Sequence, residues 1–270
     1  IETLFNNTKN ASVEPQYTGE YMTLPGLANT VYRTPHRMAV VARILAEGSV
    51  MMAHGVGSGK TFSLIIAAYE MKRLGMASKP MIVVQNQTIG QFGASYRQAY
   101  PNARVLVAND KDLGKDRRKR FLNRVAVGDW DTIIITQSQF DRLNSNEASV
   151  KQYFQRQLVE LEDAISRSRS DNGSKDATTK ELEKAKEKLQ VKQLERLEKV
   201  RKGQDEGVLS FEDMGVDAVF VDEAHEYKKV PLVTRMGQVK GVPNDHSDKA
   251  MNLEMKIAHI HRIKDGKNIV

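Results

Sequence analysis

The sequence predicts an α/β domain in which a central parallel β-sheet is flanked by helices and interrupted by a charged helical-hairpin insertion. Short apolar runs recur along the chain between turn residues, and each has the length of one buried strand. Helical patterns alternate with these runs, which favours parallel strands joined by right-handed crossovers. One long charged stretch, residues 147–202, departs from this alternation and is the predicted insertion.

The expected elements follow in order along the chain. Residues 1–30 are polar and are interpreted as an arm or linker, and Pro35 can then open a helix that ends at Gly48-Ser49. Further helices are predicted over about 60–74, up to Tyr96, and over about 115–127. Residues 268–270 read like the opening of a buried strand, so we expect a fragment of a longer protein. The predicted strands are 50–53, 81–84, 104–108, 132–136 and 218–221.

The stretch 147–202 mixes Lys and Arg with Glu and carries a turn-forming Asp171-Asn172-Gly173-Ser174 near its middle. Interspersed charges of both signs are typical of i,i+4 pairs on solvent-exposed helices. We therefore predict an antiparallel helical hairpin that projects from the sheet domain. A structural arm is the favoured role, and a contact with duplex DNA or a partner domain is the alternative. The leucines of the stretch are Leu158, Leu161, Leu182, Leu189, Leu194 and Leu197.

Composition narrows the functional classes. None of the 270 residues is a cysteine, which excludes disulfides, zinc fingers and cysteine nucleophiles within this sequence. The formal net charge of +7 favours a polyanionic partner, although many basic proteins bind no nucleic acid. We find no signal peptide and no apolar run long enough to span a bilayer. The expectation is a cytoplasmic protein without a membrane partner.

The strongest local signal is the run Gly55-Val56-Gly57-Ser58-Gly59-Lys60-Thr61, which lies between a predicted strand and a predicted helix. Glycines let the backbone approach a phosphate without a Cβ clash, and the N–H groups of such a loop and helix N-terminus bind anions. The pattern predicts an ATP site in which Lys60 reaches the β- and γ-phosphates and Thr61 ligates Mg²⁺. His54 replaces the usual first glycine or alanine. The alternative is a flexible glycine turn that matches the pattern by chance.

An acidic run, Asp222-Glu223-Ala224-His225, follows the predicted strand 218–221. Carboxylates at the carboxyl end of a parallel strand lie where ligands bind in open α/β sheets. We predict that Asp222 holds Mg²⁺, that Glu223 polarises the attacking water, and that His225 lies near the γ-phosphate. Alone, the run can be the acidic start of a helix. Its occurrence after the glycine loop favours ATP hydrolysis with Lys60, Asp222 and Glu223 as the catalytic residues.

These two runs resemble motifs I and II of superfamily 2 helicases. Residues 79–84 leading to Gln91-Phe92 resemble motif Ia of the Swi2/Snf2-like group, although Gln85 replaces a common proline and Phe92 a common tryptophan. Residues 134–140 resemble motif Ib. The likeness is closest to the DarB-type antirestriction proteins of phages and plasmids, which fuse a Snf2-like helicase to an adenine-N6 methyltransferase. The resemblance covers roughly residues 30–270.

The resemblance implies a RecA-like P-loop NTPase lobe formed by residues 31–146 and 203–270, with ATP and Mg²⁺ as cofactors and duplex DNA as partner. It also implies a second RecA-like lobe and a methyltransferase domain elsewhere in a phage-encoded parent chain. The arginine finger belongs to the second lobe, so we expect this fragment to bind ATP but to hydrolyse it slowly. Such motors often carry an upstream glutamine that reads adenine. No clear equivalent is present, although His36 lies in that neighbourhood.

Carried over from the family, the nucleic-acid strand contacts the motif Ia and Ib loops. Short polar side chains suit phosphate contacts, which position the strand without reading its sequence. Ordinary loop capping is the alternative. The basic stretch 115–124 is a further candidate, against the alternative of a solvated charged face. The candidate residues are Asn86, Gln87, Thr88, Gln137, Ser138, Gln139, Arg117, Arg118 and Arg120.

The predicted function is therefore that of the ATP-binding lobe of a Snf2-like DNA helicase or translocase. A nucleotide-gated DNA-binding module without productive translocation is one alternative, and an RNA helicase is the other. Intact Lys60, Thr61, Asp222 and Glu223 favour a working motor over the first alternative.

Overall fold

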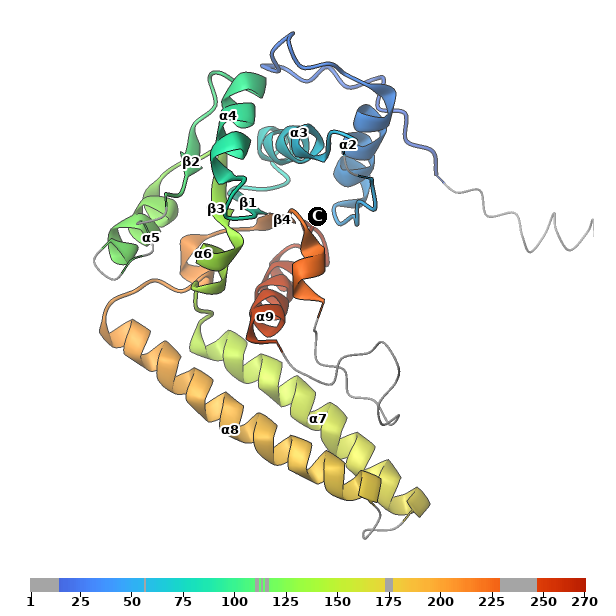
Figure 1. Ribbon diagram of the computed structural model, residues 1–270, viewed down its shortest axis with the longest axis vertical. Coiled ribbons are helices and arrows are strands. Elements are labelled where there is room, and N and C mark those ends of the chain that lie inside the picture. The colour runs from blue at the N-terminus through green and yellow to red at the C-terminus, as the bar shows by residue number, and fades with distance from the viewer. Residues whose placement is uncertain are drawn as a thin grey trace, which may run out of the picture.

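The computed structural model describes residues 15–55, 57–109, 112, 114, 117–172, 177–228 and 247–270. Within them the chain forms an α/β fold whose four-stranded sheet has the order β2-β3-β1-β4 (Figure 1). Every strand pairing in this sheet is parallel, so the predicted fold class is confirmed at this level. The strands are β1 (Pro80–Val84), β2 (Val105–Val107), β3 (Thr132–Thr136) and β4 (Ala218–Val221).

Helices cover both faces of this sheet because side chains alternate along each strand. Ile82 and Ile134 face a core cluster shared with α2 (Pro35–Glu47), α3 (Lys60–Arg73) and α4 (Ile89–Ala99). Their neighbours Met81 and Ile133 face the opposite cluster, shared with α5 (Arg118–Val127) and α9 (Asp248–Ile263). All residues of β1 and β3 are buried, as expected for strands covered on both sides. No helix in the described part of the chain is long and apolar enough to cross a membrane.

The first predicted strand, 50–53, is wrong, because these residues take no strand assignment. Val50 N donates to Ile269 O at 3.0 Å, but the adjacent Met51 is 88% exposed. A strand needs a hydrogen-bonding neighbour along its length, whereas the contact with residues 268–270 is confined to residues 48–50. The segment 268–270 does lie beside β4, with Val219 N donating to Asn268 O at 3.0 Å, as its strand-like sequence predicts.

The packed domain begins earlier than the boundary expected at residue 30. Residues 1–14 of the predicted arm lie outside the described residues. Leu24 and Leu27 are buried in the same cluster as α3 and α4, and Ala28 N donates to Ala99 O at 2.8 Å. Two leucines within a polar stretch therefore attach residues 24–28 to the core.

The charged insertion is an antiparallel hairpin of α7 (Glu147–Asn172) and α8 (Ala177–Asp205), as predicted, and it projects from the sheet domain (Figure 1). Ion pairs join the two helices, including Lys186 with Glu162 at 2.6 Å. Leu161 and Leu182 are buried between the helices, whereas Leu194 is 65% exposed. The hairpin follows the short α6 (Gln137–Asp141) and leads through the 3₁₀ turn η1 (Glu212–Met214) to β4.

A fully buried lysine fixes α9 to the sheet domain. Lys256 Nζ donates to Phe140 O at 3.0 Å and lies 4.3 Å from the centre of the Phe140 ring. Burial lowers the Lys256 pKa from 10.5 to about 7; Asp141 and Glu212 raise it against this effect, and Arg196 lowers it further. The folded state therefore disfavours the charged amine.

We expect Lys256→Met to stabilise the fold at neutral pH by on the order of a few kcal/mol. Between pH 7 and 10.5 the unfolded chain binds more protons than the folded chain. The loss of folding stability caused by burying the Lys256 ammonium is therefore complete below pH 7 and disappears as the pH approaches 10.5. Urea unfolding of both proteins at pH 7 and pH 10 measures the difference. If the two proteins differed in unfolding free energy by the same amount at both pH values, the charge of the buried amine would not be the cause of the difference.

Candidate functional site

The glycine loop, residues 55–61, leads directly into α3. Gly57 and Gly59 have φ angles of 81° and 83°, in the left-handed region that favours glycine. Gly59 is the N-cap of α3, so Lys60 and Thr61 form the first turn of that helix. No described atom lies within 4 Å of the position of a Cβ at Gly55 or Gly57, so the loop faces open space. Val56 lies outside the described residues.

Lys60 folds back over this loop. Its Nζ donates to His54 O at 3.0 Å, so the ammonium group is held next to the residue that precedes the loop. The buried Ser58 Oγ has no hydrogen-bond partner among the described residues. Together with the free N–H groups at the start of α3, these groups form a cationic site suited to an anion.

The start of α2 contacts the same loop, which the sequence did not reveal. A ring nitrogen of His36, Nε2, lies 3.0 Å from Ser58 O. The Arg37 guanidinium lies over the Phe62 ring at 5.4 Å, and a Cβ on Gly59 would lie 2.7 Å from Arg37 Nη2. Pro35 marks the start of α2, but no spacing in the sequence indicates that this start packs on the loop.

The acidic run lies at the carboxyl edge of the sheet, where β4 ends beside β1. Asp222 N donates to Val83 O at 2.8 Å, which extends the β1–β4 ladder by one residue. Burial raises the pKa of Asp222, Glu223 raises it further, and the Lys60 ammonium opposes both. The Lys60 ammonium is therefore close enough to Asp222 to act on its carboxyl electrostatically, and a common nucleotide site for the two motifs stays a prediction.

Glu223 adopts a conformation that is uncommon for a residue with a side chain. Its φ and ψ angles are 55° and 50°, in the left-handed region, and it is the N-cap of the turn η2 (Ala224–Tyr227). Glu223 Oε2 lies 3.0 Å from His225 Nδ1. Unusual backbone angles of this kind concentrate at functional sites, where the surrounding structure holds them.

These residues fit a nucleoside triphosphate with Mg²⁺. The glycine loop, Lys60 and the α3 N-terminus supply the positive side, while Thr61 and the half-buried Asp222 supply oxygen ligands. Among the described residues no cluster of three or more His, Asp or Glu side chains is arranged to hold a metal. Mg²⁺ commonly binds through one or two protein oxygens plus phosphates and water, so this donor set is sufficient.

The two predicted nucleic-acid loops lie together because β1 and β3 are neighbours in the sheet. Ser138 Oγ donates to Asn86 Oδ1 at 2.9 Å, which joins the loop after β1 to the loop after β3. Asn86, Gln87 and Ser138 are exposed. Thr88 is partly buried, and its hydroxyl donates to Gln85 O at 3.1 Å.

Gln137 and Gln139 do not present their side chains to solvent, contrary to the prediction that they contact nucleic acid. Gln139 is 4% exposed and forms a capping box with Thr136, and its amide donates to Asn109 O at 2.6 Å. Gln137 is 6% exposed, and its amide donates to Asp222 O at 3.0 Å. Gln139 therefore caps the start of α6, as in the alternative of ordinary loop capping. Gln137 contacts the acidic run instead.

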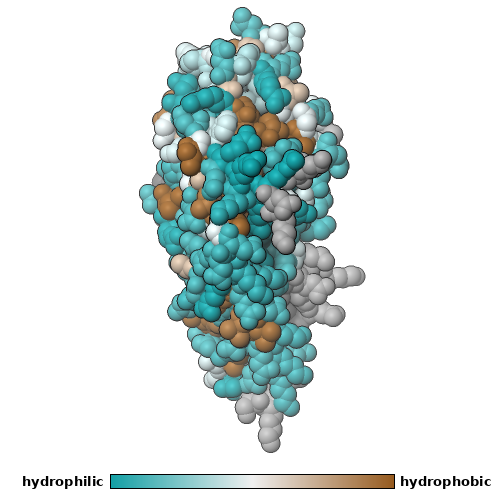
Figure 2. Space-filling model, turned by 90° about the vertical axis from the view of Figure 1, so that its left-hand side faces the viewer, coloured by the Kyte–Doolittle hydropathy of each residue, from teal (hydrophilic) through white to brown (hydrophobic). Residues whose placement is uncertain are grey.

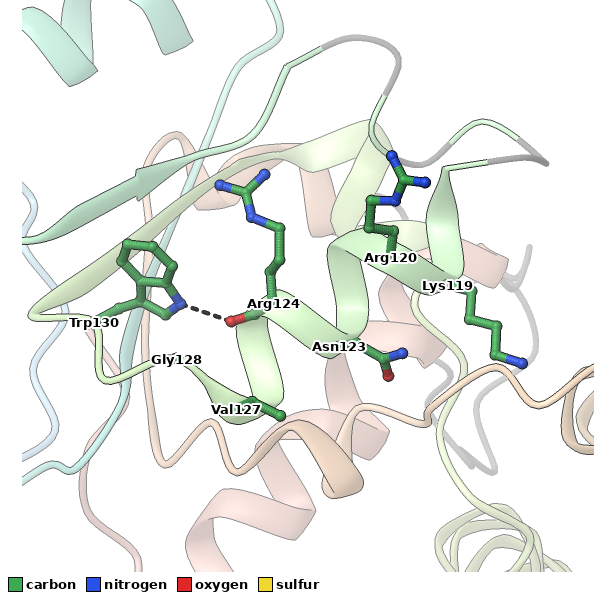
Figure 3. Close-up of a pocket in the computed structure, with 7 residues that line it drawn as sticks. All are labelled: Lys119, Arg120, Asn123, Arg124, Val127, Gly128 and Trp130. Carbon is green, nitrogen blue, oxygen red and sulfur yellow. Dashed lines mark hydrogen bonds between the residues drawn. The ribbon is translucent and has the colours of Figure 1, made fainter.

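The basic helix α5 presents a cationic groove. Arg117 is exposed, but Arg118 is not free for a ligand, because it is half-buried, burial lowers its pKa, and it donates to Arg142 O. Beyond it, a shallow groove of about 730 Å³ runs along the outer side of the helix (Figure 3). Trp130 closes one end, where its indole N–H donates to Arg124 O at 2.8 Å. The groove residues are Lys119, Arg120, Asn123, Arg124, Val127, Gly128 and Trp130.

Three cations of this groove, Lys119, Arg120 and Arg124, form no side-chain ion pair with any described residue. Each is exposed. The face of the molecule that carries α5 is mainly hydrophilic, with separate hydrophobic patches (Figure 2). Residues 115 and 116 of the predicted basic helix lie outside the described residues. The three exposed cations make the groove suited to an extended anion.

Taken together, these features define an α/β domain with a glycine loop at the start of α3 and an acidic run at one edge of a parallel sheet. A scan against family models matches residues 43–269 to a family described as a probable helicase domain. The match covers most of the chain, so the chain belongs to this helicase-domain family. It includes the glycine loop, the hairpin and the acidic run. A search of the curated proteins found no match.

Proposed function

We propose that the chain is the ATP-binding lobe of an ATP-dependent DNA helicase or translocase of the Snf2-like type. The observation that carries the proposal is the placement of the acidic run at the carboxyl end of β4 beside β1, where the Lys60 ammonium at the start of α3 acts on the Asp222 carboxyl electrostatically. Membership of a helicase-domain family supports it. The RecA-like P-loop fold belongs to the same proposal and is supported by the strand order and the position of the glycine loop.

In this proposal Lys60 exchanges the His54 carbonyl for phosphate oxygens, and Thr61 and Asp222 hold Mg²⁺. The metal ion, when bound, neutralises phosphate charge and orients the nucleotide. Glu223 orients and polarises the attacking water, and His225 holds the Glu223 carboxylate through their 3.0 Å contact. His225 therefore acts through Glu223, as a positioning residue.

The proposed nucleic-acid track runs over Asn86, Gln87 and Ser138, with the α5 groove as a second contact for the phosphate backbone. Polar loop side chains and exposed cations suit contacts that do not depend on base sequence. From the resemblance alone, we further propose a cytoplasmic, phage- or plasmid-encoded parent chain with a second RecA-like lobe and a methyltransferase domain.

The test of the proposal is ATP hydrolysis by the parent chain in the presence of duplex DNA, single-stranded DNA or RNA. Strong stimulation by duplex DNA, abolished in a Lys60→Ala variant, supports a Snf2-like translocase. Stimulation only by RNA would instead identify an RNA helicase. Tight ATP binding without turnover on any polymer would identify a nucleotide-gated binding module.

Charge reversal in the α5 groove tests the second nucleic-acid interface. We expect Arg120→Glu with Arg124→Glu to weaken duplex binding and to reduce the slope of log affinity against log salt by about 0.9 for each phosphate that the protein no longer neutralises. Fluorescence anisotropy at several salt concentrations measures this slope. Lys184→Glu with Lys188→Glu, at exposed positions on α8, is the control with the same charge change. A slope equal to that of the unchanged protein would assign the groove to the solvated surface.

A further inference from the structure

Gln137 lies between the acidic run and α9. Its side-chain amide nitrogen donates to the main-chain oxygen of Asp222 at 3.0 Å. Its side-chain oxygen accepts from Lys249 Nζ at 3.1 Å. Both polar ends of the side chain are therefore used within the protein, and the residue is 6% exposed. Gln137 thus fixes the backbone of Asp222 at the end of β4.

Lys249 is held in place by the elements around it. Its ammonium group lies 4.6 Å from the centre of the Tyr227 ring and 3.9 Å from Glu226 Oε2, both in the turn η2 that follows Glu223. One helical turn further along α9, Asn252 donates to Asp141 O at 2.5 Å. Lys256, one turn beyond, donates to Phe140 O. Three side chains on one side of α9 therefore hold α6 and η2 together.

The helix α9 also rests on the hairpin. Arg196 of α8 donates to Asn252 Oδ1 at 2.9 Å, and Lys192 pairs with Asp248 at 2.7 Å. From α7, Arg156 pairs with Glu254 at 2.6 Å. The orientation of Lys249 toward Gln137 therefore depends on a helix that the insertion supports.

We propose that Gln137 and Lys249 are positioning residues for Asp222, and that they set the direction of its carboxylate toward the bound Mg²⁺. The inference rests on the proposed function, because it concerns the same nucleotide site. The carboxylate follows directly after the anchored β4 ladder, and the next residue, Glu223, is in the left-handed conformation. A hydrogen bond to the Asp222 carbonyl restrains the peptide between these two residues, which determines where both carboxylates point.

The hydrogen bond from Gln137 to Asp222 also connects the loop after β3, which is proposed to bind nucleic acid, to the nucleotide site. Ser138 is the immediate neighbour of Gln137 and is bonded to Asn86 on the adjacent loop. A phosphate bound at Ser138 therefore acts on a backbone that is only one residue from the Asp222 anchor. The path from the proposed strand-binding loop to the metal ligand is short and consists of hydrogen bonds.

The experiment measures binding of a fluorescent ATP analogue to the full chain, once with EDTA and once with increasing Mg²⁺. We expect Gln137→Leu to raise the Mg²⁺ concentration at half-saturation about tenfold, the lower end of the range for residues that orient metal ligands, while the EDTA affinity is unchanged. Lys249→Met should shift it in the same direction, and Lys249→Arg should restore most of the Mg²⁺ affinity. Lys186→Met removes an ion pair with Glu162 between the two hairpin helices, away from α9, and is the matched control.

If Gln137 and Lys249 had a purely structural role, their substitution would lower thermal stability and would affect binding of the analogue equally with EDTA and with Mg²⁺. An unchanged Mg²⁺ half-saturation in both Gln137→Leu and Lys249→Met, in folded protein, would overturn the inference. If the unchanged protein bound the analogue in neither condition, the proposed function itself would fail. Amide hydrogen exchange distinguishes the two failures, because removal of the anchor should speed exchange at Asp222 and Glu223 even without nucleotide.

Discussion

Replacing Lys60 by alanine should reduce the affinity for MgATP by about 100-fold or more and remove DNA-stimulated hydrolysis. Lys60 is the cation in the first turn of α3, and its Nζ lies 3.0 Å from His54 O at the start of the glycine loop. A charge-assisted hydrogen bond to phosphate contributes roughly 1.5–3 kcal/mol, and a lysine that reaches two phosphates forms more than one. The loss of this binding free energy corresponds to the expected rise of about 100-fold in the dissociation constant for MgATP.

Isothermal titration of both proteins with MgATP measures the effect. Lys72→Ala is the matched control, since Lys72 lies on the same helix but pairs with Asp129 at 2.9 Å, at the end of α3 opposite the loop. We expect this control to bind MgATP as the unchanged protein does. Equal affinity of the Lys60→Ala variant would contradict the assignment of residues 55–61 as a phosphate-binding loop.

Replacing Glu223 by glutamine should lower kcat by about 10²–10⁴-fold, the usual contribution of a positioned general base, with little change in ATP affinity. Glutamine keeps the size of the side chain but cannot accept a proton from water. The left-handed backbone at Glu223 and the contact with His225 hold this carboxylate in place. The effect is therefore expected on turnover rather than on binding.

Single-turnover hydrolysis in the parent chain, combined with a separate binding measurement, distinguishes the two quantities. Glu47→Gln is a suitable control, because Glu47 forms only a surface pair with Arg43 on α2 and a hydrogen bond with Tyr17 among the described residues. A Glu223→Gln protein that hydrolyses ATP at the normal rate would move the role of base to another residue. A protein that binds ATP weakly would instead indicate that Glu223 holds the metal.

The sequence predicted the sheet well because its strands depend on local composition. Residues 132–136 are apolar enough to be buried on both faces in any arrangement of a parallel sheet. Residues 50–53 have a similar composition but form no strand, since strand formation there depends on a partner more than 200 positions away. Local patterns do not contain that information.

The candidate site was predicted unevenly for a related reason. Glycines and carboxylates indicate their chemistry directly, so the sequence alone marks the loop and the acidic run as candidates. The sequence placed Gln137, Ser138 and Gln139 on one loop but could not tell which side chains point inward, and only Ser138 is exposed. Lys249 was missed because its contact with Gln137 joins residues 112 positions apart.

The segments that lead into and out of the hairpin lie side by side at its base. This limits how the length of the hairpin can vary within the family. Phe211 N donates to Asn144 O at 2.8 Å, and Asn146 N donates to Glu212 Oε2 at 2.7 Å, so the chain leaves the core and returns at the same point. The outer apolar cluster around Leu161 and Leu182 involves the hairpin alone, whereas the inner one includes Met251 and Met255 of α9. Evolution can therefore lengthen or shorten the outer half of the hairpin without disturbing the strands, while the inner half is constrained to change together with α9.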